Sequence, residues 1–305
     1  MPEALARTAD ASHRTPPAPS GPGPALVPAR PWPAAVLTMT ASSLSNQTGA
    51  AIGALAFPVL GPPGVVAVRQ YVAALVLCAV GRPRLRAFTA RQWWPVLLLA
   101  VVFATMNLSL YTAVDRIGLG LAVTLEFLGP LGIALAASRR GKDACCALLA
   151  AAGVLTLTRP QPSADFVGMG LGLLAAACWA AYILLNRTVG RRVPGAQGPA
   201  AAALVSALVF LPVGVAVAVR HPPTAGAAGC AVAAGVLSSA VPLLADLRTL
   251  RRVSAPVFGL FMSVNPVLAG LVGWIVLGQG LGWAECAGIG AIVAANAIVI
   301  GAPDR

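Results

Sequence analysis

The feature that most constrains this chain is a succession of long, almost uncharged apolar runs separated by short segments rich in arginine. About 20 apolar residues in a helix are enough to cross the hydrocarbon core of a bilayer. Because these runs are continuous and do not alternate with polar residues, they predict helices and not the strands of a barrel. We expect ten membrane-spanning helices, at residues 34–57, 62–81, 93–113, 117–137, 143–158, 167–189, 199–219, 226–247, 255–277 and 282–301.

The composition excludes a soluble enzyme. Of the 305 residues, 58% are hydrophobic and 10% are charged, whereas a soluble domain has about 45–50% and about 25%. The same hydrophobicity excludes disorder along the whole chain. A net charge of +12 would suggest a nucleic-acid partner in a soluble protein. Here the basic residues lie between apolar runs, so we expect the lipid bilayer and no nucleic acid as a partner.

The basic residues also predict the orientation of the chain. Of the 21 Lys and Arg residues, 17 fall on one side of the ten runs, 3 fall on the other side, and Arg69 lies inside the second run. Since cytoplasmic loops carry the excess of basic residues, we expect both termini in the cytoplasm. Residues 1–32, which are rich in proline and have no periodicity, are expected to form a disordered cytoplasmic tail.

The two halves of the membrane part, 33–160 and 161–305, resemble each other. An offset of 136 residues places Pro130 on Pro266 and Asp143 on Gln279. Because each half has five predicted helices, an odd number, the second copy enters the membrane inverted. Inverted repeats are typical of secondary transporters, which bind substrate near the midplane between the repeats. The alternative is chance similarity between two stretches rich in alanine, leucine and glycine.

Several short motifs resemble a known family. The motifs are VTLEFLGP at 123–130, SRR at 138–140, SSAVP at 238–242, LRR at 250–252 and VFG at 257–259. In these motifs the chain resembles the EamA-domain branch of the drug/metabolite transporter superfamily, and within it the threonine/homoserine exporters. The resemblance implies ten helices in two inverted five-helix repeats and export of metabolites, often amino acids, across the plasma (inner) membrane. Asp246, Asn265 and Gln279 stand where this family commonly has Glu.

Glu126 is the strongest candidate for a functional residue. It lies ~13 Å into the fourth run at the rise of an α-helix, where an ionised side chain costs ~2.5–3.5 kcal/mol. We therefore expect it to face a cavity or a partner. Pro130 has no N–H, so the carbonyl of Glu126 loses its donor one turn later. Glu126 is interpreted as a site for a proton or a substrate amine, or alternatively as a structural partner of Arg69.

Arg69 admits three interpretations. It could keep Glu126 deprotonated, it could bind a substrate carboxylate through two parallel hydrogen bonds, or its side chain could extend to the outer interface. Further polar and aromatic residues gather on single faces of the predicted helices, and they could line a cavity for a small zwitterion. Each of them could instead form an interhelical hydrogen bond worth ~0.6 kcal/mol. These residues are Asn46, Gln47, Asn107, Tyr111, Trp179, Tyr182, Met262 and Asn265.

The sequence carries no signature of an enzyme. Its only two histidines are His13 and His221, and it has no Walker A motif, so we expect neither a metal, a cofactor nor ATP hydrolysis. The prediction is a secondary active exporter of small metabolites, above all amino acids, that works by alternating access and couples to protons. A broad exporter of lipophilic cations and a non-transporting membrane subunit are the alternatives. The sequence leaves open whether the chain forms a homodimer.

Overall fold

A computed structural model describes residues 32–137, 149, 152–153, 165–242, 265–280 and 282–301. The chain divides into the units Met1–Trp32 and Pro33–Arg305, and the description below concerns the second. Three predictions lie wholly or largely outside the described residues. They are the tail at 1–32, the helix at 143–158 and the position of Met262.

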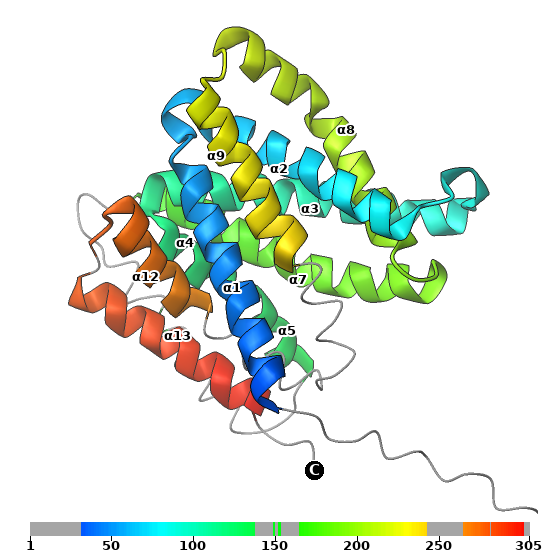
Figure 1. Cartoon of the computed structure of the whole chain (residues 1–305). Coiled ribbons are helices and arrows are strands. Elements are labelled where there is room, and N and C mark those ends of the chain that lie inside the picture. The colour runs from blue at the N-terminus through cyan, green and yellow to red at the C-terminus, as the bar shows by residue number, and fades with distance from the viewer. Residues whose placement is uncertain are drawn as a thin grey trace, which may run out of the picture. The chain divides into compact units, whose positions relative to one another are not determined.

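The described residues form helices and contain no strand (Figure 1). Four helices, α2, α3, α7 and α8, are long and apolar enough to cross a membrane. The prediction of an all-helical membrane protein is therefore confirmed over this part of the chain. In chain order the elements are α1 (Trp32–Ala54), α2 (Phe57–Gly81), the short helix η1 (Leu85–Ala87), α3 (Ala90–Ile117), α4 (Leu119–Glu126), α5 (Leu128–Ala137), α7 (Phe166–Arg192), α8 (Gln197–Arg220), α9 (Ala225–Gly235), the π-helix η2 (Val236–Ala240), α12 (Asn265–Leu277) and α13 (Trp283–Gly301).

Helices α2 and α8 run side by side in opposite directions. A Cβ added at Gly81, at the end of α2, would lie 2.9 Å from the Cβ of Ala200 near the start of α8. One added at Gly64, near the start of α2, would lie 2.9 Å from Cγ1 of Val217 near the end of α8. Small residues allow helix backbones in a membrane to approach closely. Glycines at both ends therefore fix these two helices against each other.

Helix α3 packs along α7, and an ion pair joins them at one end. Nε of Arg116, in the last turn of α3, lies 2.9 Å from Oδ2 of Asp165. Asp165 also caps α7, because its Oδ1 accepts a hydrogen bond of 2.8 Å from the backbone N–H of Gly168. A side-chain oxygen at this position satisfies one of the free N–H groups of the first turn. The pair and the cap together hold the start of α7 against the end of α3.

Two helices begin or break at positions other than those expected. The second helix was expected at 62–81, but α2 begins at Phe57 and is kinked at Gly61, which has φ 65°. Proline is tolerated in a first helical turn. Because the helix starts again after the kink at Gly61, Pro62 and Pro63 occupy the first turn of its second part.

The helix expected at 117–137 is divided into α4 and α5. Gly118, with φ 84°, separates α4 from α3, and a turn at Phe127 separates α4 from α5. The second break follows from Pro130, which cannot donate to the carbonyl of Glu126. The chain is therefore interrupted next to the one acidic side chain of this segment.

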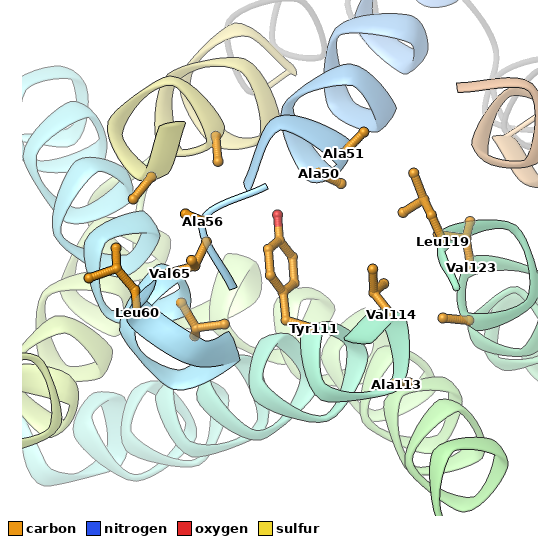
Figure 2. Packing of buried hydrophobic residues seen from close by; sticks show 14 of the residues in the cluster. Ala50, Ala51, Ala56, Leu60, Val65, Tyr111, Ala113, Val114, Leu119 and Val123 are labelled. Carbon is orange, nitrogen blue, oxygen red and sulfur yellow. The ribbon is translucent and has the colours of Figure 1, made fainter. Parts of the chain in front are cut away.

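The buried core lies where α1, α2, α3 and α4 meet. Figure 2 shows Tyr111 of α3 projecting between these helices, with Ala50, Val65, Val114 and Leu119 around it. Most of these neighbours are alanine or valine. Small side chains let the helices approach closely while the large phenol ring fills the space between them. Tyr111 also lines the cavity described below.

Candidate functional site

A cavity of about 290 Å³ lies between α1, α2, α3, α4, α7, η2 and the start of α12. Nine of the ten residues proposed from the sequence line it, and the tenth, Met262, lies outside the described residues. The nine come from segments far apart in the chain, so the fold brings them together. They are Asn46, Gln47, Arg69, Asn107, Tyr111, Glu126, Trp179, Tyr182 and Asn265.

Glu126 is the last residue of α4 and faces this cavity. Its side chain is 7% exposed. Among the described residues, no Lys or Arg nitrogen lies within the 4.0 Å of an ion pair from its carboxylate. A buried carboxylate without a partner is costly in its charged form. Its geometry therefore leaves Glu126 able to accept a proton or a cation that enters the cavity.

Arg69 is held on the cavity wall from two sides. Its Cζ lies 4.5 Å from the centroid of the Tyr111 ring, and its Nη2 donates to the carbonyl of Ser238 over 3.4 Å. Arg69 is 8% exposed, and its Nε has no hydrogen-bond partner among the described residues. A buried donor without a partner is costly. An anion in the cavity could supply that partner.

The π-helix η2 forms the part of the wall next to α1. Such wide turns are rare and often mark functional sites. Ser45 donates from Oγ to the carbonyl of Leu237 over 2.9 Å, and Ser238 donates from Oγ to the carbonyl of Asn46 over 2.9 Å. A Cβ added at Gly49 would collide with Ser238. Hydrogen bonds in both directions and a glycine contact therefore bind α1 to η2.

A buried hydrogen bond joins α1 to α12. Nε2 of Gln47 donates to Oδ1 of Asn265 over 3.1 Å. Asn265 is the first residue of α12 and precedes Pro266. Both amides lie on the cavity wall. The contact therefore links the two segments that would have to separate if the cavity opened between them.

Aromatic side chains form another wall. The rings of Phe127 and Trp179 meet edge to face with centroids 4.7 Å apart, and those of Phe103 and Tyr182 lie 5.9 Å apart. Asn107 donates from Nδ2 to the carbonyl of Phe103 over 2.8 Å. This bond lies within α3, so it does not join two helices.

Several residues that line the cavity were not expected from the sequence: Ser43, Ser238, Ser239, Phe103, Met106 and Phe127. Ser42 also lines it, as its place one turn before Asn46 on the polar face of the first helix indicates. Ser43 lies one turn before Gln47, and the same helical spacing could have placed it on this wall. Ser238 and Ser239 belong to a motif already noted for its resemblance. The wide turn that carries them has no signature in the sequence.

The cavity therefore combines one carboxyl, one guanidinium, amides, hydroxyls and aromatic rings. Its volume lies near the lower end of ligand pockets, which span ~300–1,000 Å³. No group of three or more His, Cys, Asp or Glu residues in the described part of the chain could hold a metal ion. This arrangement is suited to a small solute that carries charges of both signs.

Comparison with known proteins identifies the family. The chain is 36% identical over 271 residues to the threonine/homoserine exporter RhtA of Escherichia coli strain K12, which covers 87% of this chain and 90% of that protein. The chain belongs to the EamA-like transporter family. Residues 166–301 match that family directly. The RhtA of Salmonella typhimurium strain LT2 is also 36% identical, over 267 residues that cover 86% of this chain and 89% of its own.

A solved protein structure is similar to this chain in fold. It has a TM-score of 0.58 and 19% sequence identity, and it covers 87% of this chain and 96% of its own. Membership of this family makes the chain a membrane transporter and not an enzyme.

Proposed function

We propose that this chain exports small amino acids, with threonine and homoserine as the first candidates, and that the cavity is its substrate site. The observation that carries the proposal is the presence of two buried opposite charges, Glu126 and Arg69, which line one cavity without forming an ion pair. An amino acid carries both complementary charges. The relatives at 36% identity, which are threonine/homoserine exporters, support the same substrate class.

In this proposal the two charges have different partners. The planar guanidinium of Arg69 binds the substrate carboxylate, which matches its fork of donors. Glu126 accepts the substrate ammonium group. The serine hydroxyls and the Asn46 amide offer partners for a hydroxylated side chain. Because Arg69 lies on the same wall, a lipophilic cation without a negative group would be repelled, which disfavours that alternative.

The second role proposed for Glu126 is proton coupling. Burial disfavours the charged form of a carboxylate, and a nearby guanidinium favours it. A conformational change that alters the distance of Glu126 from Arg69 or from water would therefore load or release a proton. Among the described residues that line the cavity, Glu126 is the only acid. In this proposal the proton that drives export binds to Glu126 and is released from it.

The proposed architecture is ten helices in two inverted repeats with both termini in the cytoplasm. Adding 136 to the first residues of α2, α3 and α5 gives 193, 226 and 264, and α8, α9 and α12 begin at Gln197, Ala225 and Asn265. The matched helices α2 and α8 run in opposite directions, as an inverted repeat requires. Reporters active on only one side of the membrane, fused to the C-terminus, test the orientation. Activity confined to the outside would contradict it.

The transport proposal is tested with purified protein in proteoliposomes loaded with a panel of labelled amino acids. We expect a pH gradient to accelerate the efflux of threonine and homoserine. The amino alcohol threoninol, which lacks the carboxylate, should not be transported. The variant Arg69→Gln should lose this discrimination. Transport of tetraphenylphosphonium with no transport of any amino acid would overturn the proposal in favour of a cation exporter.

A further inference from the structure

Six exposed arginines gather at one end of the four membrane-spanning helices. We name this surface the arginine face. Three of its residues lie between α2 and α3, one lies in the first turn of α3, and two end α7, about a hundred positions later in the chain. The arginine face consists of Arg82, Arg84, Arg86, Arg91, Arg191 and Arg192.

Hydrogen bonds hold the segment between α2 and α3, and the start of α3, against the end of α7 and the start of α8. Nε2 of Gln92 donates to the carbonyl of Arg192 over 2.8 Å, and Nη1 of Arg192 donates to the carbonyl of Arg91 over 3.0 Å. The backbone N–H of Arg84 donates to Oε1 of Gln197 over 3.3 Å. All the acceptors are neutral oxygens. The contacts therefore hold the arginines close together without neutralising their charge.

The charge at this end has no acidic counterpart among the side chains that the structure describes. The three acids among them lie elsewhere: Asp115 and Asp165 at the opposite ends of α3 and α7, and Glu126 in the cavity. The only ion pair among the described residues, between Arg116 and Asp165, also lies at that opposite end. Packed helices lie ~8–10 Å apart, which is close to the Debye length of ~8 Å in physiological salt. The six charges consequently repel one another unless anions screen them.

The residues beside the arginine face are of the kind expected at the level of the lipid headgroups. The four helices that meet there are the ones long and apolar enough to span a membrane. Trp93 and Trp94 follow directly in α3, and Trp94 is 48% exposed. The Cζ of Arg192 lies 4.8 Å from the centroid of the Trp94 ring. Tryptophan is enriched where a bilayer meets water, so we expect the neighbouring guanidiniums at the level of the lipid phosphates.

We propose that the arginine face binds the phosphate groups of anionic phospholipids in the bilayer that the chain spans. Guanidinium matches phosphate through two parallel hydrogen bonds. Clusters of four to eight basic residues beside a membrane-spanning helix attract anionic lipids. Scattered loop charges would suffice to orient the chain. Here the fold instead gathers six arginines on one surface, and this surface is complementary in charge to several headgroups at once.

Native mass spectrometry of the full chain, after incubation in a bilayer of equal parts phosphatidylglycerol and phosphatidylcholine, measures which lipid the protein retains. We expect the wild type to retain phosphatidylglycerol selectively. The triple variant Arg82→Gln, Arg84→Gln, Arg86→Gln should lose that selectivity by about tenfold or more, since each basic residue contributes to attraction. Replacing the same three residues by Lys should retain most of it. The matched control is Arg220→Gln at the opposite end, which should behave as the wild type.

Loop arginines also orient the chain in the membrane, so the triple variant could lose lipid selectivity by inserting in the wrong orientation. A second variant controls for this effect. The double variant Arg191→Gln, Arg192→Gln leaves the arginines between α2 and α3 unchanged, and it should also reduce the selectivity for phosphatidylglycerol. Soluble glycerol phosphate distinguishes a lipid from a free phosphate as the source of the anion, and it should not displace the retained lipid. Unchanged selectivity in both variants, or displacement by millimolar glycerol phosphate, would overturn the proposal. Neither outcome bears on amino-acid export, so the two proposals fail separately.

Discussion

Replacing Gly129 by alanine tests how closely α5 packs against α7, three residues after Glu126. Gly129 is the second residue of α5 and is buried. A Cβ added there would overlap the carbonyl oxygen of Ala176 and would lie 3.0 Å from its carbonyl carbon. Both atoms belong to the backbone of α7, which cannot turn aside as a flexible side chain could. Gly129→Ala should therefore push α5 away from α7.

Two opposing effects set the change in stability that Gly129→Ala causes. Alanine in place of glycine stabilises a helix by ~0.5–1 kcal/mol, whereas overpacking of this kind costs ~1–3 kcal/mol. Gly132, one turn later in the same helix, is the matched control, because a Cβ added there meets nothing within 4 Å. Gly132→Ala should gain only the stability that alanine adds to a helix in place of glycine. The difference between the two variants then isolates the clash, which we expect to be ~1–3 kcal/mol.

The assay is unfolding in mixed detergent micelles with increasing dodecyl sulfate, measured for both variants and for the wild type. Gly129→Ala should unfold at a lower dodecyl sulfate fraction than Gly132→Ala, and it should also slow transport because the clash lies three residues from Glu126. Equal stability of the two variants would refute the close approach of α5 to α7.

Three further predictions concern other contacts. Gln279→Ala removes the acceptor of the 2.9 Å hydrogen bond from the backbone N–H of Leu119 and should destabilise the chain by ~0.5–2 kcal/mol, whereas Gln279→Glu, measured in the same micelles, should cost less. The hydrogen bond from the backbone N–H of Gly168 holds the pKa of Asp165 below its ordinary value of 3.8. This contribution to stability is therefore complete above pH 3.8 and is lost as the pH falls through the lowered pKa. Asp165→Asn should show a smaller loss of stability with acid, and an identical acid profile would contradict the cap. A cysteine placed at Asn265 should react with a water-soluble thiol reagent and be protected by substrate, and absence of reaction in every transport state would place Asn265 outside the transport path.

Much of the membrane architecture could be predicted because it depends on local composition. The apolar runs at 93–113 and 199–219 correspond to α3 and α8, which are longer at both ends. Glu126 and Arg69 stood out because charge inside an apolar run is costly wherever the helix lies. Pro130 indicated a loosened turn, and the structure has a one-residue turn at Phe127 between α4 and α5.

Other features depend on contacts between distant segments and could not be predicted from local patterns. The wide turn at Ser238 is bound by α1, which lies almost two hundred residues earlier in the chain. Gln279 meets the start of α4 only because the fold brings residues 160 positions apart together. The long α2 was missed because prolines normally end helices, whereas here a positive φ at Gly61 accommodates two of them.

The proton-coupling role proposed for Glu126 is tested by the Glu126→Gln variant in proteoliposomes. Two transport modes are compared in the same preparation: net movement of threonine driven by a pH gradient, and exchange of labelled for unlabelled threonine without a gradient. Because glutamine fills the same space but cannot release a proton, we predict that gradient-driven transport is lost while the fold, the membrane level and measurable exchange are retained. Accumulation of threonine at the wild-type rate under a pH gradient would contradict the account and leave Glu126 without a role in coupling.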